Sequence, residues 1–189
     1  VKGHDFPNVT LVAALAADMS LYAGDYRSSE RTFELLMQAS GRAGRAEKAG
    51  EVVIQTYNPE EYSIQAVARQ DAEYFYENEL AFRRLMKYPP YSQMAAILIL
   101  SEEESEAKTL SEKLAENIHS VCGDAVTLIG PSKAGLSRAK DRYRYVLYVK
   151  SMNEEAMACV REIAEEANRR VVNQKTCSVQ YDRDPVNGY

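Results

Sequence analysis

The chain has 189 residues, of which 46% are hydrophobic and 27% are charged, and its formal net charge is -5. This composition is ordinary for a soluble globular protein, and the length allows one large core or two small ones. The negative charge excludes a uniformly basic coat, so any contact with nucleic acid must come from local patches. The sequence has no apolar run long enough to cross a bilayer.

The sequence begins at Val1 without a methionine and shows no secretory signal, which predicts a cytoplasmic fragment of a longer protein. The three cysteines are widely separated and show no CxxC spacing, so we expect single buried thiols. His4 and His119 are too few and too far apart to suggest a metal site. We therefore expect this chain to bind no metal.

Residues 1–57 predict the back half of an α/β unit. Residues 9–15 form a continuous apolar run, which is typical of a strand buried on both faces of a parallel sheet. A helix that Ser28 or Ser29 can cap follows this strand. Residues 52–57 have the β-branched composition of the next strand.

Residues 38–45, Gln-Ala-Ser-Gly-Arg-Ala-Gly-Arg, carry two arginines three residues apart, each directly preceded by a glycine. On a helix this spacing places the guanidinium groups of Arg42 and Arg45 on nearly the same face. Gly41 and Gly44 let another backbone or a phosphate come close. Two planar charged groups directed at one point suit a polyphosphate, although the same run can be a solvated basic helix end.

Residues 58–90 predict a helical connector. Asn58 and Pro59 favour a helix start, and the Pro89-Pro90 pair ends the helical part and marks a domain boundary. The aromatic residues of this segment are Tyr62, Tyr74, Phe75, Tyr76 and Phe82. We expect their rings in a core, and stacking on single-stranded bases is the alternative.

Residues 91–189 show a regular order of strand, helix, strand, strand, helix and strand. The strands are expected at 94–100, 126–129, 143–150 and 177–181, and the helices at 107–121 and 156–171, with Val121 and Val171 facing inward. A Gly/Ser/Lys-rich loop is expected between the second and third strands. This order is that of a ferredoxin-like split βαβ sandwich, in which two helices cover one face of a four-stranded sheet.

Residues 133–150 concentrate cations against a single acidic residue, Asp141. Such cations neutralise phosphates and release counterions, and tyrosine rings stack on exposed bases. A solvated basic loop beside a half-buried strand explains the same residues equally well. The candidate DNA-binding residues are Lys133, Arg138, Lys140, Arg142, Arg144 and Tyr145.

Residues 38–45 resemble the final signature motif of superfamily 2 helicases, and residues 3–12 resemble the preceding helicase motif. The segments 25–33, 50–59, 88–92 and 142–145 extend the resemblance over the whole chain. Together they are similar to the primosomal protein N′ (PriA) family of bacterial replication-restart helicases. The sequence departs from the family at Gly24, Ala46 and Ala49, where proline, glycine and proline are expected.

The resemblance implies an α/β fold, with a partial second RecA-like helicase lobe (1–57), a helical connector (58–90) and a ferredoxin-like C-terminal domain (91–189). It implies that Arg42 and Arg45 are catalytic and reach toward the γ-phosphate of ATP on another lobe. The nucleotide-side residues that it implies are Gln38, Gly41, Gly44, Gly3 and Asp5.

The resemblance also implies an ATP-dependent 3′-to-5′ DNA helicase that recognises stalled or forked DNA and assembles a primosome. Its cofactors would be ATP and Mg²⁺, with zinc in the full-length protein and none in this chain. Its partners would be forked and single-stranded DNA, single-strand-binding protein and primosome proteins, with no membrane. This chain lacks the Gly-x-x-x-x-Gly-Lys-Ser/Thr phosphate loop, so alone it is expected to be inactive. A non-enzymatic DNA- or protein-binding adaptor is the alternative.

Overall fold

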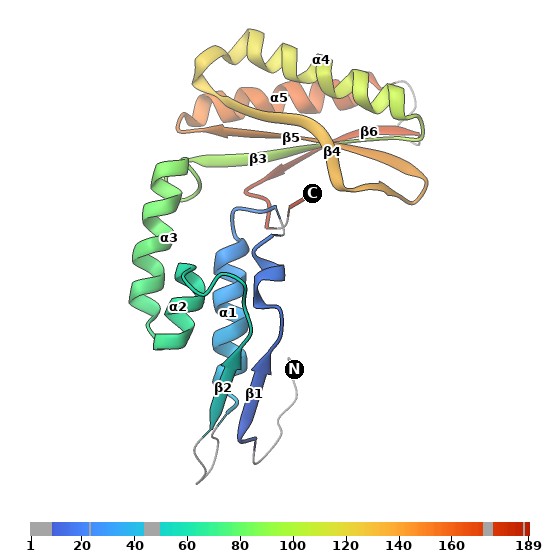
Figure 1. The fold of residues 1–189 in the computed structure, drawn as a ribbon. Coiled ribbons are helices and arrows are strands. Elements are labelled where there is room, and N and C mark those ends of the chain that lie inside the picture. The colour runs from blue at the N-terminus through green and yellow to red at the C-terminus, as the bar shows by residue number, and fades with distance from the viewer. Residues whose placement is uncertain (1–8, 23, 44–49, 172–175, 187) are drawn as a thin grey trace. The chain divides into compact units, whose positions relative to one another are not determined.

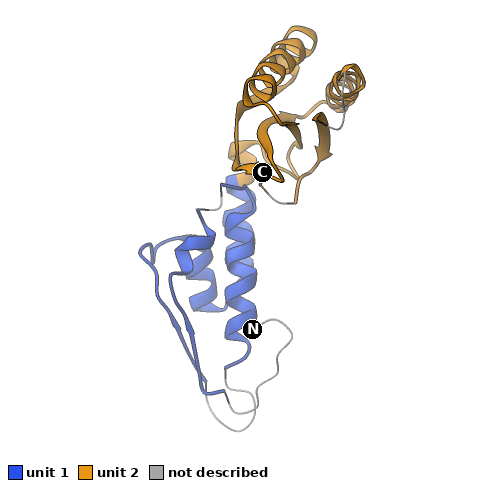
Figure 2. Cartoon of the chain, turned by 90° about the vertical axis from the view of Figure 1, so that its right-hand side faces the viewer, with its two compact units in different colours: residues 1–82 blue, residues 83–189 orange. Residues whose placement is uncertain are grey.

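The computed structural model describes residues 9–22, 24–43, 50–171, 176–186 and 188–189. The chain divides into two compact units, a first unit of residues 1–82 and a second unit of residues 83–189 (Figures 1 and 2). The sequence predicts a division into three segments, 1–57, 58–90 and 91–189. That division stays a prediction.

The first unit contains a parallel strand pair joined by a helix. Its elements are β1 (Leu11–Ala14), the 3₁₀ helix η1 (Ala17–Ser20), α1 (Ser28–Ser40), β2 (Glu51–Ile54), α2 (Tyr62–Arg69) and α3 (Ala72–Met86), which continues past the unit's last residue. Leu11 pairs with Glu51 and Ala14 with Ile54, so β1, α1 and β2 form one βαβ crossover. The crossover confirms the predicted pair of strands around a helix. The prediction that the first strand is buried on both faces is wrong, because exposed and half-buried residues alternate along β1.

α1 begins at Ser28, but no serine caps it. Arg27 occupies the position before the helix and makes no side-chain cap. Asp25 organises the start instead, because its carboxylate accepts a hydrogen bond from the Arg27 amide at 2.9 Å and forms an ion pair with Arg31. The Ser28 hydroxyl donates to the Asp25 carbonyl at 2.5 Å, so it is already engaged. The predicted cap by Ser28 or Ser29 is therefore wrong.

The start predicted for the next helix at Asn58 is also wrong. Residues 59–61 form a turn, and α2 begins at Tyr62. The Glu61 carboxylate accepts hydrogen bonds from the amides of Ser63 at 2.7 Å and Ile64 at 3.3 Å. Glu61 therefore satisfies two of the free amides of the first helical turn, which is the role of a cap.

Aromatic rings fill the core of the first unit. The Phe33 ring stacks on Phe75 with 4.1 Å between ring centroids, and Tyr62 lies 5.9 Å from Phe75. Phe75 is 1% exposed, which confirms the core prediction for this residue. Tyr76 and Phe82 are 56% and 40% exposed, so the prediction is wrong for these two rings.

The second unit has a four-stranded sheet in the order β4, β5, β3 and β6, with neighbouring strands antiparallel. Its elements are β3 (Gln93–Ser101), α4 (Glu104–Cys122), η2 (Gly123–Ala125), β4 (Thr127–Ala139), β5 (Arg142–Ser151), α5 (Glu154–Arg170) and β6 (Cys177–Arg183). Both long helices cover one face of the sheet (Figure 1). The predicted ferredoxin-like split βαβ sandwich is confirmed.

Alternation along β5 separates two apolar clusters. Tyr145, Leu147 and Val149 join the main core beneath α4 and α5. Val146 lies in a smaller cluster that Tyr148 packs against, so the even-numbered residues face the opposite side. Val121, predicted to face inward from α4, is 58% exposed near the end of that helix.

β4 extends through most of the segment predicted as a loop. It continues to Ala139, with shifts in its pairing with β5 between Ile129 and Ser132 and between Lys133 and Arg138. Gly130 has a φ of +98°, and a Cβ there would lie 3.0 Å from a backbone carbonyl of β5, so this irregularity requires glycine. The β4–β5 hairpin is therefore a structured arm.

Candidate functional site

The first candidate site is the turn that follows α1. The helix ends at Ser40, and the amides of Gly41 and Arg42 bond to the carbonyls of Met37 at 3.0 Å and Ala39 at 3.1 Å. Arg42 thus lies in a turn, and the prediction that a helix carries it is wrong. Glycine destabilises a helix. Hydrogen bonds from an amide to the carbonyl three residues earlier commonly tighten the last turn of a helix. The predicted site residues Gly44 and Arg45 lie outside the described residues.

The βαβ crossover fixes where this turn lies. In a parallel pair with a crossover helix, the end of the helix returns to the end at which both strands begin. The Glu51 amide at the start of β2 donates to the Thr10 carbonyl at 2.8 Å, so the two strand starts are adjacent. The turn therefore lies beside the starts of β1 and β2, and the predicted Gly3 and Asp5 precede β1 in the sequence. Those residues lie outside the described residues.

The structure brings three predicted residues together in and after the last turn of α1. Gln38 and Gly41 are exposed, and Arg42 is half-buried. The apolar face of the helix is held in the core by Phe33 and Leu36, which are 6% and 8% exposed. Packing of that face thus fixes the direction in which the polar end of α1 points.

Asp18 anchors the other end of the strand pair, although it is not among the site residues predicted from the sequence. It is 4% exposed, and its carboxylate accepts hydrogen bonds from the Thr56 hydroxyl and from the Tyr57 amide at 2.6 Å. These hydrogen bonds, with that of Thr56 the largest cause, lower the pKa of the Asp18 carboxyl. Asp18 therefore ties η1 to the segment after β2. An acidic residue between an apolar run and a loop was the available signal.

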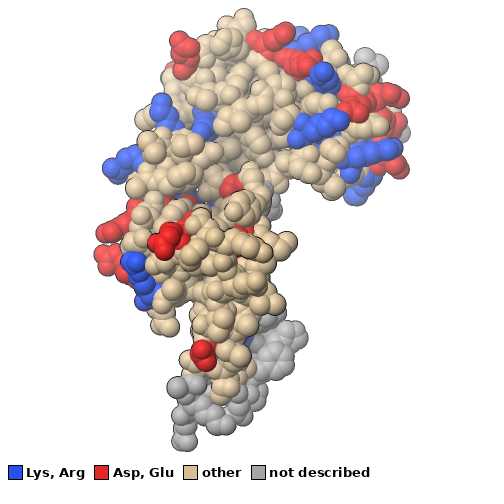
Figure 3. Space-filling view, viewed as in Figure 1, with Lys and Arg blue, Asp and Glu red and all other residues tan. Residues whose placement is uncertain are grey.

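The second candidate site is the basic β4–β5 hairpin. Lys and Arg side chains gather, with acidic side chains beside them, at the end of the second unit that carries this hairpin (Figure 3). Alternation divides the predicted cations between two faces. Arg142 and Arg144 are on the face opposite the helices, whereas Lys133 pairs with Tyr145 and faces the helices. They do not form one continuous patch.

The cations of the hairpin differ in how they are held. The Lys133 ammonium lies 2.5 Å from the Glu104 carboxylate, which lowers the pKa of Glu104 and raises that of Lys133. Arg138 lies over the Tyr143 ring at 5.2 Å and 3.5 Å from Asp141. Lys133 is thus engaged within the second unit, while Arg138 is partly held at the tip.

The hairpin presents three further cations, Lys140, Arg142 and Arg144. Lys140 and Asp141 form the turn, and both have positive φ, of 51° and 59°. Arg144 donates a hydrogen bond to the Leu136 carbonyl at 3.0 Å. Lys140 is exposed and Arg142 is half-buried, so the arm offers cations to a phosphate backbone.

The position of Tyr145 does not suit the predicted contact with DNA. Its ring is 7% exposed and packs in the core beneath the helices. Its hydroxyl lies 3.4 Å from Glu104 and points to the same side as Lys133. A base can stack only on an accessible ring, so in this conformation Tyr145 is a core residue. Alternation with Leu147 and Val149 was the signal in the sequence.

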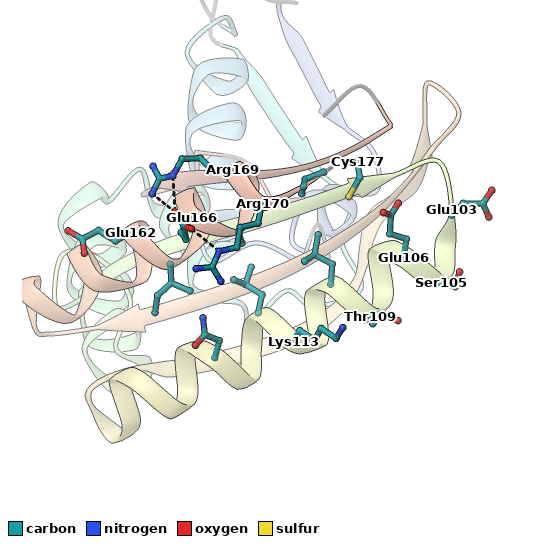
Figure 4. Close-up of a pocket in the computed structure, with 16 residues that line it drawn as sticks. Glu103, Ser105, Glu106, Thr109, Lys113, Glu162, Glu166, Arg169, Arg170 and Cys177 are labelled. Carbon is teal, nitrogen blue, oxygen red and sulfur yellow. Dashed lines mark hydrogen bonds and ion pairs between the residues drawn. The ribbon is translucent and has the colours of Figure 1, made fainter. Parts of the chain in front are cut away.

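A third feature is the groove between α4 and α5 (Figure 4). It has a volume of about 1430 Å³, and Leu110, Leu114 and Ile163 contribute apolar surface to it. Arg169 and Arg170 both bond to Glu166, at 2.9 Å and 2.7 Å. Among the described residues no ion pair crosses the groove. Its rim carries both signs of charge, so charge alone does not indicate a class of ligand for this groove.

Metal-binding clusters are absent from the part of the chain that the structure describes, where no three His, Cys, Asp or Glu side chains could hold an ion. Cys122 and Cys159, predicted as single thiols, are neighbours: burial and then Cys159 raise the pKa of Cys122 to about 11. None of the described helices is both long and apolar enough to span a membrane.

The chain thus joins a βαβ unit with a Gln-x-x-Gly-Arg turn to a ferredoxin-like unit with a basic arm. The family model described as the primosomal protein N C-terminal domain matches residues 84–186, and the chain belongs to this family. The match lies entirely within the second unit.

Curated relatives extend the similarity to the first unit. "Replication restart protein PriA" of Bacillus subtilis is 44% identical over 97% of this chain and 23% of its own length. The protein of the same name from Synechocystis sp. is 40% identical over 79% of this chain and 18% of its own length. That from Borreliella burgdorferi is 28% identical over 98% of this chain and 28% of its own length. The chain therefore spans only 18% to 28% of the length of these relatives.

Proposed function

We propose that this chain supplies two parts of an ATP-dependent 3′-to-5′ DNA helicase of replication restart. The first part is the arginine turn after α1, and the second is the basic β4–β5 hairpin. The observation that carries the proposal is the return of α1 to the start of β1 and β2. This crossover puts the turn with Gln38, Gly41 and Arg42 beside the starts of β1 and β2, which supports their assignment to one nucleotide-side cluster. The similarity to replication restart proteins supports the same assignment.

The arginine turn would act on charge. Phosphoryl transfer develops negative charge on the transferred group, and the guanidinium groups of Arg42 and Arg45 would neutralise it when two lobes close. An arginine of this kind contributes roughly 10³ to 10⁵ in turnover in other systems. ATP with Mg²⁺ would be held by residues outside this chain, because its sequence contains no phosphate loop.

Two measurements test the arginine assignment. The purified 189-residue chain should show no DNA-stimulated ATP hydrolysis. In the intact helicase, Arg42→Ala or Arg45→Ala should abolish ATP hydrolysis and leave DNA affinity within about twofold, since neither is assigned to DNA. Lys140→Ala is the converse control, and its main effect should be weaker DNA binding. Equal loss of both activities in the arginine variants would contradict the assigned role.

The basic hairpin would hold the DNA backbone of a fork. Lys140, Arg142 and Arg144 are the cations that we assign to it: Lys140 is exposed, and Arg142 and Arg144 lie half-buried on one face of the arm. Forked-DNA affinity should fall steeply with salt, and Arg142→Ala should reduce the slope by roughly 1. Lys113→Ala on α4 is the matched control, because Lys113 carries the same charge and lines the groove between α4 and α5 rather than the hairpin. An unchanged slope in Arg142→Ala would remove the hairpin from the DNA site.

The longer protein would also bind single-stranded DNA, single-strand-binding protein and primosome proteins, and its zinc would be held outside this chain. One observation favours a second function for the second unit alone, a non-enzymatic adaptor: the family model matches residues 84–186 and not the arginine turn. An intact protein in which Arg42→Ala and Arg45→Ala leave ATP hydrolysis unchanged would favour the adaptor.

A further inference from the structure

The sheet face opposite α4 and α5 carries its own apolar and basic residues. Ala96, Leu98 and Val146 are buried there and form a cluster separate from the main core. By alternation along β5, Arg142 and Arg144 lie on this same face toward the hairpin. An apolar strip bordered by cations is the composition of a surface that binds nucleic-acid bases and phosphates.

Tyr189 covers this face. Its hydroxyl donates a hydrogen bond to Asp182 at 2.5 Å, and its amide donates to the Tyr148 hydroxyl at 2.9 Å. Its carbonyl accepts from the Gly135 amide at 2.8 Å. Asp182, Tyr148 and Gly135 belong to β6, β5 and β4, so one residue reaches partners on three strands.

The contacts of Tyr189 are close. Burial and then the hydrogen bond to Asp182 raise the pKa of the Tyr189 phenol to about 12. A Cβ at position 135 would lie 3.4 Å from the Tyr189 carbonyl, so the glycine lets that residue approach β4. The Tyr148 hydroxyl, which would otherwise point to solvent or to a ligand, is occupied by the Tyr189 amide.

We propose that this face of the sheet is a binding surface for single-stranded DNA, and that Tyr189 keeps it closed. The inference rests on the proposed DNA-binding function of the second unit. When Tyr189 is displaced, the Tyr148 ring and the apolar strip accept bases, while Arg142 and Arg144 contact the phosphates. A DNA base takes the place of the Tyr189 ring, because both are planar groups laid on an apolar sheet.

The first test measures binding of a fluorescent oligothymidine of about 15 nucleotides by anisotropy, with the whole 189-residue chain. Tyr189→Ala should raise the affinity roughly tenfold, because the competing side chain and its hydrogen bond are lost. The double variant Tyr189→Ala with Tyr148→Ala should lose that gain. Tyr22→Ala is the matched control, since Tyr22 is 77% exposed in the first unit. An unchanged affinity in Tyr189→Ala would overturn the closed surface.

The second test keeps a large side chain in place and follows it directly. The chain contains no tryptophan, so Tyr189→Trp introduces a single indole whose emission reports its burial. Oligothymidine should shift that emission to longer wavelength over the same concentrations that raise the anisotropy. Binding by anisotropy with an unmoved indole places the DNA elsewhere and overturns this inference, while DNA binding by the unit stands. Absence of binding in every variant would overturn both.

Discussion

Tyr145 distinguishes a core role from a DNA-contact role within the basic segment. Its ring is 7% exposed beneath the helices, whereas the neighbouring Arg144 lies on the opposite face of β5. Tyr145→Ala would leave a cavity between the sheet and α4. Removal of a buried aromatic ring costs about 3–5 kcal/mol of unfolding free energy, and we expect a value in this range.

The hydroxyl of Tyr145 should contribute much less than the ring. It lies 3.4 Å from the Glu104 carboxylate, at the long end of hydrogen-bond distances. Tyr145→Phe should therefore cost less than about 1 kcal/mol and leave DNA affinity within about twofold. Arg144→Ala is the matched control, with a small effect on stability and a loss of DNA affinity.

Urea unfolding followed by circular dichroism gives the free energies, and anisotropy with forked DNA gives the affinities. Two results would refute the reasoning. Tyr145→Ala that costs less than about 1 kcal/mol would mean that the ring is not a core group. Tyr145→Phe that weakens DNA binding as much as Arg144→Ala, at unchanged stability, would mean that the tyrosine contacts DNA through its hydroxyl.

Three further predictions concern stability. Glu61→Ala should cost about 0.5–2 kcal/mol in urea unfolding because the α2 cap is lost, while Glu60→Ala should have little effect, and equal costs would contradict the cap. Asp141→Gly should raise the thermal midpoint, because it relieves a non-glycine residue at φ 59°, and a lowered midpoint would refute this. Lys133 lowers the pKa of the Glu104 carboxyl. The contribution of Glu104 to stability is therefore present above the unfolded pKa of 4.5 and is lost as the pH falls through the folded pKa. The thermal midpoint of the unaltered chain should therefore exceed that of the Glu104→Gln variant at neutral pH, and the difference should vanish in acid. A difference that does not depend on pH would exclude the ion pair as its cause.

The sequence predicted the second unit well because its central elements carry strong periodic patterns. β5 alternates between the two faces of the sheet, and α5 places Ala156 and Val160 in the core as expected. β4 was missed beyond Ile129 because it is an edge strand. Such a strand needs little apolar surface, and it is held by backbone pairing with β5 around two irregularities that its composition does not reveal.

Helix starts were predicted less well, for a local reason. Several polar residues precede each helix, and each could cap it on composition alone. The backbone of the preceding turn decides which one reaches the free amides. At α2 the turn over 59–61 gives that position to Glu61, and at α1 the loop engages Asp25 with Arg31 and Arg27. Such choices depend on geometry that the order of residues does not contain.

The arginine turn shows the same limit at longer range. A spacing of three residues predicted a shared helix face, but α1 stops at Ser40 before either arginine. The position of the turn depends instead on the pairing of Leu11 with Glu51, forty residues apart in sequence. Hydrophobic periodicity predicts both strands and the helix between them. It does not predict the helix end, which is where the proposed chemistry lies.

The geometry of Gly41 bears on why a glycine precedes the arginine. Its φ is -65°, which any residue adopts, so the backbone conformation does not require glycine there. A Cβ at this position would meet the Met37 carbonyl at 3.5 Å, an ordinary contact, so packing within the unit does not require it either. Two structural reasons for glycine are thus removed. Two possible reasons remain: glycine favours the end of α1, and it leaves open space that the proposed approach of a phosphate to the Arg42 backbone would need.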